Sequence, residues 1–315
     1  MRPEIPEPYL ENTPQNYYKL AWAERLKFVR ALIDVGEDNP YRIIKLLERH
    51  ENRHDLGMVS QAASFRDENG NVVEELEVFT GQADWLPIDP GPADSLIPTG
   101  VAAVTDNSFH GEALTLPAYT DIKGIVAGWI IDLVDDNCDA IVELGAGFGR
   151  NLFNVHLGGG PRGIPYFSGE YAESGRELAE LLAALDPQLD LRAVAFDHSD
   201  ADFEFLAGFE QPLVFTCHSI EQVHMLPADY FAKLAAAAPR VTCIHFEPFG
   251  FQIDTDNPFS KQQREMFTDR KWNQNFVPLL QQAANDGTIQ VSHIYKDMIP
   301  NEAPSPTSVA LWRNF

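Results

Sequence analysis

The hydrophobic positions in the first third of the chain change from a helical period to a strand period. Between residues 18 and 33, apolar side chains recur every three or four positions, which is the spacing of an amphipathic helix. A second helix is predicted to begin at Asn39 and Pro40, because a cap residue followed by proline is typical of a first turn. From 58 to 79 the pattern indicates two strands around an Asp-Glu-Asn-Gly turn at 67–70.

From residue 117 onward, short apolar strands alternate with helical segments. A helix with apolar residues between 122 and 133 precedes seven predicted strands, at 140–144, 165–169, 191–196, 213–217, 241–246, 289–295 and 308–312. Most of them are separated by predicted helices, as in parallel βαβ units, at 150–155, 173–185, 227–237 and 272–284. The last two strands leave no room for a helix between them, so we expect one of the two to run antiparallel.

These patterns predict an α/β fold with a doubly wound, mostly parallel seven-stranded sheet and an N-terminal extension of helices and a β-hairpin. We divide the chain into a helical segment at 1–56, a hairpin and loop segment at 57–116 that could act as a lid, and the sheet domain at 117–315. Proline, Asp and Gly dominate residues 85–98, which predicts a surface loop within the second segment.

The N-terminal extension carries many aromatic residues, among them Trp22, Phe28 and Tyr41. A solvated tail would not need them, so we expect this extension to pack on the carboxyl edge of the sheet. There it would contact a substrate, with Phe109 and His110 as the candidate side chains. The alternative is a dimerisation arm, which would make the protein a homodimer.

Composition limits the partners of this chain. It has 315 residues, with 23 Lys and Arg against 47 Asp and Glu, so its formal charge is −24. A chain of that charge repels polyanions, and we expect neither a nucleic-acid partner nor an anionic membrane surface. The most apolar stretch, 124–134, is about half as long as a membrane span. The start of the chain has no apolar signal segment, and Cys138, Cys217 and Cys243 lack metal-ligand spacing. A cytoplasmic protein without a metal is therefore predicted.

The sharpest chemical signal is the string Glu-Leu-Gly-Ala-Gly-Phe-Gly at 143–149, between a predicted strand and a predicted helix. Its glycines allow the backbone to turn tightly and to approach a ligand, while the start of the helix offers free N–H groups. The ends of the next three strands also carry polar residues: Glu170, then Asp197 with His198, then His218. Because the carboxyl ends of parallel strands meet at one edge of a sheet, these residues are expected to converge on one crevice.

In these features the sequence resembles the class I S-adenosylmethionine-dependent methyltransferases. The string at 143–149 matches the first motif of that family, and the match implies cofactor contacts from Glu143, Gly145, Ala146, Gly147 and Gly149. The resemblance also implies that Glu170 binds both ribose hydroxyls and that Asp197, beside His198, contacts the adenine. It covers 117–315 and implies S-adenosylmethionine as the cofactor. The segments 245–248 and 306–308 are similar to those of sugar and other small-molecule O-methyltransferases.

Two other interpretations of the glycine string remain open from the residues. A dinucleotide-binding oxidoreductase also places an acid after a glycine loop, but its Gly-x-Gly-x-x-Gly spacing differs from the one here. The glycines could also serve only a tight turn between strand and helix. That interpretation leaves Glu143 and Glu170 at partly buried strand ends without an evident partner.

The acceptor side is predicted at the ends of the fourth and fifth strands. Methyl transfer needs in-line alignment, and a hydroxyl or ammonium acceptor also needs a base. His218 is the first candidate, with Glu221 to orient its ring or to hold a cationic acceptor; the alternative is that His218 only shapes the pocket. Strand alternation places His245 and Glu247 on one side of the sheet, as further catalytic candidates. Arg150 is expected to pair with a carboxylate of cofactor or substrate, or else to form a surface ion pair.

We therefore interpret the sequence as an enzyme that methylates an oxygen or nitrogen of a small-molecule acceptor. The fourth strand does not end in the Asn/Asp-Pro-Pro-Tyr string that nucleobase-methylating branches of the family carry, which again argues against a nucleic-acid substrate. One alternative is N-methylation of a cationic amine or guanidinium, favoured by the acidic balance. Another is a catalytically silent binding subunit that keeps the cofactor fold.

Overall fold

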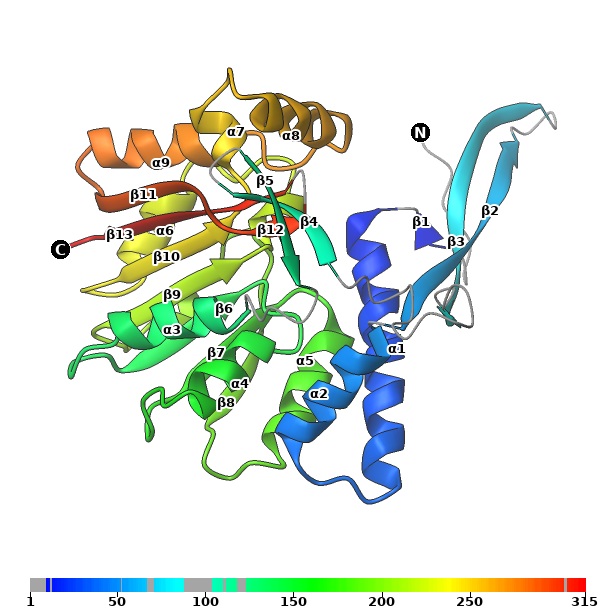
Figure 1. Cartoon of the computed structure of the whole chain (residues 1–315), viewed down its shortest axis with the longest axis horizontal. Helices are drawn as coiled ribbons and strands as arrows, with labels where there is room; N and C mark the ends of the chain where they lie inside the picture. Colours follow the sequence, from blue (N-terminus) through cyan, green and yellow to red (C-terminus); the bar gives the residue numbers. More distant parts are fainter. Residues whose placement is uncertain are drawn as a thin grey trace.

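A seven-stranded sheet forms the centre of the structure, a computed structural model that describes residues 10–11, 13–51, 53–66, 71–87, 104–109, 112–117, 123–302 and 305–315 (Figure 1). Its strands are β6 (Ala140–Leu144), β7 (Tyr166–Glu170), β8 (Leu191–Ala195), β9 (Pro212–Cys217), β10 (Thr242–Glu247), β11 (Gln290–Ile299) and β13 (Thr307–Arg313). They lie in the order β11-β13-β10-β9-β6-β7-β8. Strand β13 is antiparallel to both β10 and β11, and the others run parallel. The predicted fold class is confirmed.

Helices cover both faces of this sheet and enclose two hydrophobic cores. One core lies under α3 (Lys123–Leu133), α4 (Arg150–Leu157) and α5 (Glu173–Ala183), and the other under α6 (Tyr230–Ala236) and α9 (Phe276–Asn285). Alternate residues of each strand enter opposite cores: Val142 and Val214 join the second, whereas Ile141 and Leu213 join the first. The near-continuous apolar runs in the sequence reflect this burial on both faces.

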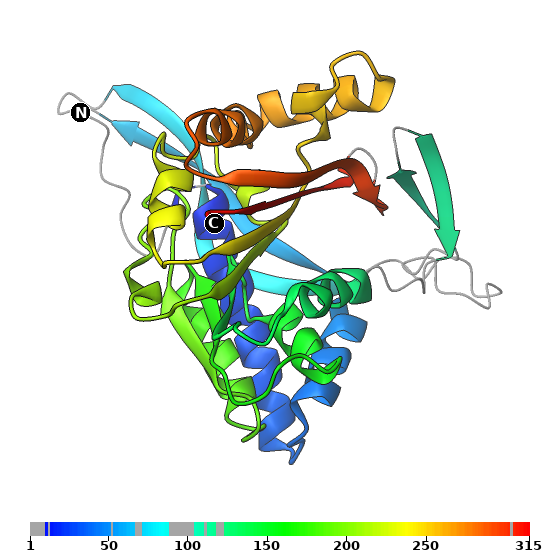
Figure 2. The ribbon, with the colours of Figure 1, turned by 90° about the vertical axis from the view of Figure 1, so that its left-hand side faces the viewer.

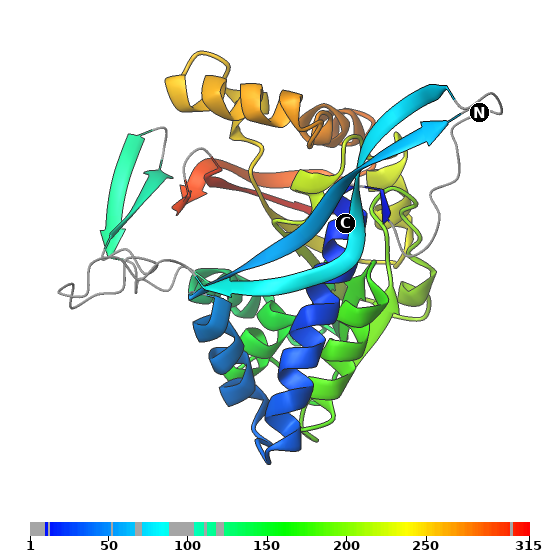
Figure 3. The same ribbon diagram turned by 90° about the vertical axis from the view of Figure 1, so that its right-hand side faces the viewer.

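The N-terminal segment comprises β1 (Leu10–Glu11), α1 (Pro14–Asp34), α2 (Pro40–Glu51) and the long hairpin of β2 (His54–Arg66) and β3 (Val72–Pro87). It meets the carboxyl ends of the parallel strands only with the start of α1 and the base of its hairpin; the rest of α1, together with α2, packs along the helices on one face of the sheet. Figure 3 shows α1 and this hairpin in front of the sheet edge. Helix α1 packs along α5, and the hydroxyl of Ser174 donates to the backbone oxygen of Lys19 at 3.3 Å.

A second, smaller hairpin was not predicted. Strands β4 (Val104–Phe109) and β5 (Glu112–Pro117) join β12 (Asn301–Glu302) in a sheet of their own. Figures 2 and 3 show it beside the end of β11, apart from the β2–β3 hairpin. The predicted turn at 67–70 lies outside the described residues. Of the predicted loop at 85–98, residues 85–87 belong to β3 and the rest lie outside the described residues.

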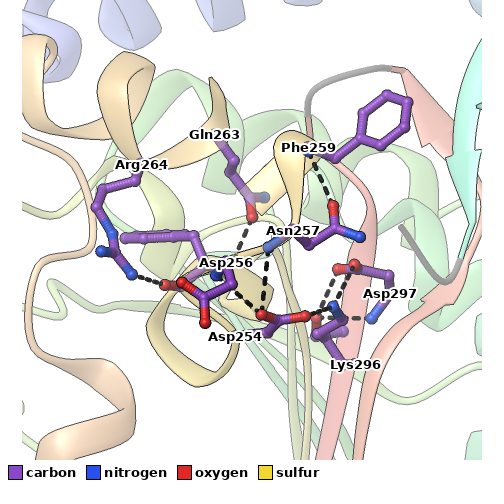
Figure 4. A network of polar contacts seen from close by, with 10 residues as sticks. Asp254, Asp256, Asn257, Phe259, Gln263, Arg264, Lys296 and Asp297 are labelled. Carbon is purple, nitrogen blue, oxygen red and sulfur yellow. Dashed lines mark hydrogen bonds and ion pairs between the residues drawn. The ribbon is translucent and has the colours of Figure 1, made fainter. Parts of the chain in front are cut away.

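The short helix α7 (Gly250–Ile253) and α8 (Pro258–Asp269), also unpredicted, are fixed by a polar network that Figure 4 shows. The Asn257 side chain caps α8 by accepting from Phe259 N at 2.8 Å, and Lys296 of β11 donates to Asp254 at 2.6 Å. The Asn-Pro pair at 257–258 is the same start signal that correctly placed α2 at residues 39–40.

His245 lies inside the second core and not at the acceptor side, which corrects its predicted placement. Its Nδ1 lies 3.0 Å from Thr216 Oγ1, and its Nε2 accepts from the Trp312 indole at 3.0 Å. Strand alternation gives the side of the sheet correctly, but His245 lies two residues before the strand end and is fully buried. Burial lowers the pKa of His245 to about 3, so the ring is neutral.

The first prediction concerns stability at acid pH. Below pH 6.5 the unfolded chain gains a proton at His245 that the folded chain excludes, so the free energy of unfolding falls as pH falls towards 3. This residue should contribute about 1.4 kcal/mol per pH unit to the slope. Denaturant unfolding between pH 4 and 6 should give His245→Gln a slope smaller by that amount. The exposed His293, changed in the same way, is the control; equal slopes in wild type and His245→Gln would contradict the assignment.

Candidate functional site

A cavity of about 600 Å³ lies where the carboxyl ends of β6, β7, β8 and β9 face α1 and the base of the β2–β3 hairpin. From the sheet side it is lined by predicted site residues: Glu143, Gly145, Ala146, Gly147, Arg150, Glu170, Asp197, His198 and His218. From the N-terminal side it is lined by Tyr17, Tyr18, Trp22, Arg25, Glu51, His54, Asp55 and Trp85. The structure thus brings most of the predicted residues to one place.

The glycine loop has a left-handed backbone at three positions. The φ angles of Gly145, Gly147 and Gly149 are +72°, +59° and +77°, values that only glycine adopts without strain. A Cβ atom at Gly145 would lie 2.3 Å from Ser219 Cβ, and one at Gly147 would lie 2.5 Å from the Trp22 ring. The first two glycines therefore also make room for neighbouring side chains.

Glu170 ends β7 directly above this loop. One carboxylate oxygen accepts from Gly147 N and the other from Ala172 N, both at 2.8 Å. Burial raises the pKa of Glu170, while these hydrogen bonds oppose the shift. Each oxygen has a second lone pair, so the carboxylate can still accept two hydroxyl groups.

Glu143, at the next-to-last position of β6, is a buried carboxyl group with one unpartnered oxygen. Oε1 accepts from Asn151 Nδ2 at 2.6 Å, whereas Oε2 is buried and has no hydrogen-bond partner. Burial raises the pKa of Glu143 to about 8. Asn151, which sequence reasoning missed, lies one residue after Arg150 on α4. Arg150 lines the cavity 3.8 Å from Glu48 of α2.

The end of β8 contributes Asp197 and His198. The Asp197 carboxylate accepts from Ser199 N at 2.7 Å and borders the cavity. The His198 ring lies 2.9 Å from Tyr230 Oη and 3.1 Å from Ser219 Oγ, and burial lowers its pKa to about 3. His198 is therefore a neutral link between β8 and the end of β9.

His218 follows β9 and has its ring held at both nitrogens. Nδ1 lies 3.0 Å from Glu221 Oε2, and Nε2 lies 2.6 Å from Thr307 Oγ1. Burial lowers the pKa of this imidazole, but the Glu221 and Glu247 carboxylates outweigh that and raise it above its ordinary value. The backbone φ of +50° is unusual for a residue with a side chain.

Glu247 does not face the cavity, in contrast to its predicted role next to the acceptor. It is fully buried, and its carboxylate accepts backbone N–H groups of the turn that follows His218. Burial raises the pKa of Glu247 to about 7. Glu221 does not line the cavity itself, but it contacts His218, which does.

The N-terminal wall consists of aromatic and charged side chains, of which only Tyr18 and Trp22 belong to the helical stripe predicted from the sequence. Tyr18 Oη accepts from Gln222 Nε2 on the turn after β9. Arg25 lies 4.8 Å from the Trp22 ring and 5.8 Å from the Trp85 ring, and its Nε donates to Glu51 at 2.6 Å. Phe109 does not line this cavity, and His110 lies outside the described residues.

Comparisons with known proteins gave matches only among solved structures: no protein-family model matches the chain, and a search of curated proteins found no significant match. Geranyl diphosphate C-methyltransferase from Streptomyces coelicolor A3(2) aligns over 61% of this chain and 79% of its own, with 13% identity and a TM-score of 0.40. Magnesium protoporphyrin IX methyltransferase from Synechocystis PCC 6803 aligns over 61% and 82%, with 13% identity and a TM-score of 0.42. Mitomycin 7-O-methyltransferase aligns over 63% and 56%, with 16% identity and a TM-score of 0.40.

One of the last two strands was expected to run antiparallel, and β13 does so; the glycine loop follows β6, an interior strand of the sheet. The chain has a doubly wound α/β fold built on this mostly parallel seven-stranded sheet. Within the part of the chain that the structure describes, no helix is long and apolar enough to span a membrane. The same residues contain no group of three or more His, Cys, Asp or Glu side chains arranged to hold a metal ion.

The second prediction tests the contact between the glycine loop and the N-terminal wall of the cavity. Gly147→Ala should cost about 1–2 kcal/mol of unfolding free energy through its left-handed backbone, and more through overlap with Trp22. Trp22→Ala should relieve only the overlap, so the double variant should be more stable than the sum of the single variants predicts, by about 1 kcal/mol or more. Urea unfolding of the four proteins measures this coupling.

Gly128→Ala is the matched control for that cycle. A Cβ there meets nothing within 4 Å, and the residue is inside α3, so the change should be neutral or slightly stabilising. If the changes in unfolding free energy of Gly147→Ala and Trp22→Ala add up to that of the double variant, the Trp22 indole does not cover the loop in solution.

Proposed function

We propose that the protein is an S-adenosylmethionine-dependent methyltransferase that acts on an oxygen or nitrogen of a small-molecule acceptor. The observation that carries this proposal is the meeting, in one cavity, of the glycine loop with Glu143 and Glu170 on one side and the His218–Glu221 pair on the other. A dinucleotide site would need only the first of these groups. A tight turn without a ligand would explain neither the cavity nor the open oxygen of Glu143.

The residues around the loop fit this cofactor. Glu170 can accept both ribose hydroxyls, and Asp197 borders the space beyond it, where an adenine amino group would be bound. The unpartnered Oε2 of Glu143 suits the ammonium group of the methionyl part, which would also favour ionisation of this carboxyl. When bound, S-adenosylmethionine supplies an electrophilic methyl group on a positively charged sulfur.

His218 is the proposed base for the acceptor. Its Nδ1 is paired with Glu221, which holds the ring and stabilises the imidazolium that forms when a proton is taken up. The proton would therefore arrive at Nε2, where the Thr307 hydroxyl lies in this structure. Alignment of acceptor and methyl group by the cavity walls would supply the remaining part of catalysis.

A second candidate is methylation of an amine that binds as a cation and loses its proton at the site. The N-terminal wall favours it, because Tyr17, Tyr18 and Trp85 border the same cavity as the exposed Asp55. Aromatic faces and carboxylates both attract cations. A screen of hydroxyl and amine acceptors with labelled cofactor would separate the two candidates, and no transfer to any acceptor would favour a silent binding subunit. A cytoplasmic location and a homodimer remain predictions.

The third prediction is that the protein binds S-adenosylmethionine and S-adenosylhomocysteine, measured by calorimetry, and does not bind NAD. Glu170→Ala should weaken cofactor binding by about 2–3 kcal/mol, because two hydrogen bonds to a carboxylate are lost. Glu180→Ala, an exposed change on the helix that follows Glu170, should leave the affinity unchanged. Binding of NAD with no response to either sulfur nucleoside would overturn the proposed function.

The fourth prediction assigns the base. His218→Asn should keep cofactor affinity and lower turnover roughly 10²- to 10⁴-fold at neutral pH. Only the neutral imidazole accepts a proton, so the wild-type rate should rise with pH through the pKa of His218, which lies above its ordinary value of 6.5. That limb of the pH profile should be absent in His218→Asn. If the variant instead raises KM and keeps the limb, His218 only shapes the pocket.

A further inference from the structure

The Glu247 carboxylate gathers a row of backbone N–H groups from the turn that carries His218. Oε1 accepts from Ser219 N at 3.1 Å and Ile220 N at 3.2 Å, and Oε2 accepts from Glu221 N at 3.3 Å. The Ser219 hydroxyl lies 3.3 Å from the same Oε1. Glu247 has no exposed surface, so these groups, and not solvent, stabilise its ionised form.

These N–H groups are the ones that the turn itself leaves free. Residues Ile220–Gln222 form a single 3₁₀ turn, and the N–H groups at its start have no carbonyl partner within it. A carboxylate at this end also interacts favourably with the aligned peptide dipoles. The Glu247 carboxylate therefore accepts the hydrogen bonds that backbone carbonyl groups of an earlier turn would accept in a longer helix.

The same contacts fix the backbone of His218. Its own N–H donates to Phe246 O at 3.0 Å, and the next three N–H groups are bound by Glu247, so β10 holds the chain on both sides of this residue. A left-handed backbone at a residue with a side chain persists only when its surroundings impose it. With that backbone, the ring reaches both Glu221 and Thr307.

We propose that Glu247 is a positioning residue for the base: its buried carboxylate holds the turn after β9 so that His218 faces the cavity in a left-handed conformation, paired with Glu221. This inference rests on the proposed function only in calling His218 the base. Glu247 does not border the cavity, so it does not reach an acceptor itself.

The charge of Glu247 also acts on the His218 ring. Two carboxylates act on this imidazole, Glu221 at Nδ1 and Glu247 behind the turn, and both favour its protonated form. Thr307, at Nε2, is uncharged. A change that removes the Glu247 charge should therefore lower the pKa of His218, whereas loss of a purely structural contact elsewhere should not.

The fifth prediction compares Glu247→Gln with the matched control Asp139→Asn. The Asp139 carboxylate likewise accepts two consecutive backbone N–H groups, those of Glu210 and Gln211, but at the opposite end of β9. In Glu247→Gln, amide hydrogen exchange in a peptide covering 218–222 should be about tenfold faster or more, because the amide side chain cannot accept all three N–H groups. Asp139→Asn should accelerate exchange near 210–211 only.

Two further measurements separate positioning from a structural role. NMR titration of the imidazole should give a lower pKa for His218 in Glu247→Gln and an unchanged one in Asp139→Asn. Turnover with an acceptor from the screen should fall roughly 10- to 100-fold in Glu247→Gln, with the KM for S-adenosylmethionine nearly constant. Glu247→Asp keeps the charge, so the pKa of His218 in this variant should stay close to that of the wild type even if the amides of the turn exchange faster. If Glu247→Gln does not fold, amide exchange at 218–222 is measured in Glu247→Asp instead.

Unchanged exchange at 218–222, or an unchanged His218 titration, in Glu247→Gln would overturn the positioning role. Neither measurement depends on methyl transfer. A protein that fails to bind the sulfur nucleosides but shows both effects would therefore refute the proposed function and leave the positioning of His218 by Glu247 intact.

Discussion

The left-handed backbone of the glycine loop is the constraint on which the site depends. Without a side chain, Gly145 lets Ser219 lie against the loop, and the Ser219 hydroxyl donates to Leu144 O at 2.9 Å. Gly147 lets Trp22 of α1 cover the loop from the other side, and its N–H donates to Glu170. Three distant parts of the chain therefore meet at one turn, and any side chain there would push at least one of them away.

Buried carboxylates are the second constraint, and a chain of charge −24 tolerates them because backbone N–H groups surround them. Glu170 and Glu247 each accept hydrogen bonds from the turns that they hold together. Glu143 differs, since one of its oxygens has no partner. Leaving a buried oxygen unpaired costs free energy, and a site that binds a cation recovers that cost when the ligand arrives. Glu247 thus only shapes the site, Glu170 shapes it and keeps lone pairs for a ligand, and Glu143 leaves one oxygen open to a ligand.

Much of the fold followed from the sequence because its strands are buried on both faces and its helices are amphipathic. The central strand at 140–144 was predicted with its observed bounds, and the others differ at their ends by a few residues. The cofactor side was predictable for the same reason: parallel strands end at one edge, so Glu170, Asp197 and His218 had to converge. Helix α8 was missed although Asn257 and Pro258 are a typical helix start, because two of the three residues it buries, Ser260 and Gln263, are polar.

The acceptor side could not be predicted equally well, because it depends on contacts between distant segments. The alternation of β10 places His245 and Glu247 on the same side, but it does not say that Phe231 and Trp312 fill that side with a core. Likewise the stripe of α1 indicated a packed helix without showing that Tyr18 and Trp22 face a cavity. Periodicity predicts which residues share a face of a strand or helix. Whether that face forms part of a core or lines a cavity depends on which other segment of the chain packs against it.

A hydrogen bond joins the N-terminal wall of the cavity to the turn after β9. Tyr18 of α1 accepts a hydrogen bond from Gln222, which belongs to the turn that Glu247 holds and that begins after His218. Under the proposed function, an acceptor bound between α1 and β9 would therefore contact a wall and a base that are joined by this hydrogen bond. In-line methyl transfer tolerates little misalignment. The hydrogen bond between Tyr18 and Gln222 would therefore let α1, which is distant in sequence, set the position of the acceptor relative to His218. Under the proposed function, α1 and the β2–β3 hairpin would determine the choice of acceptor while the glycine loop stays the same.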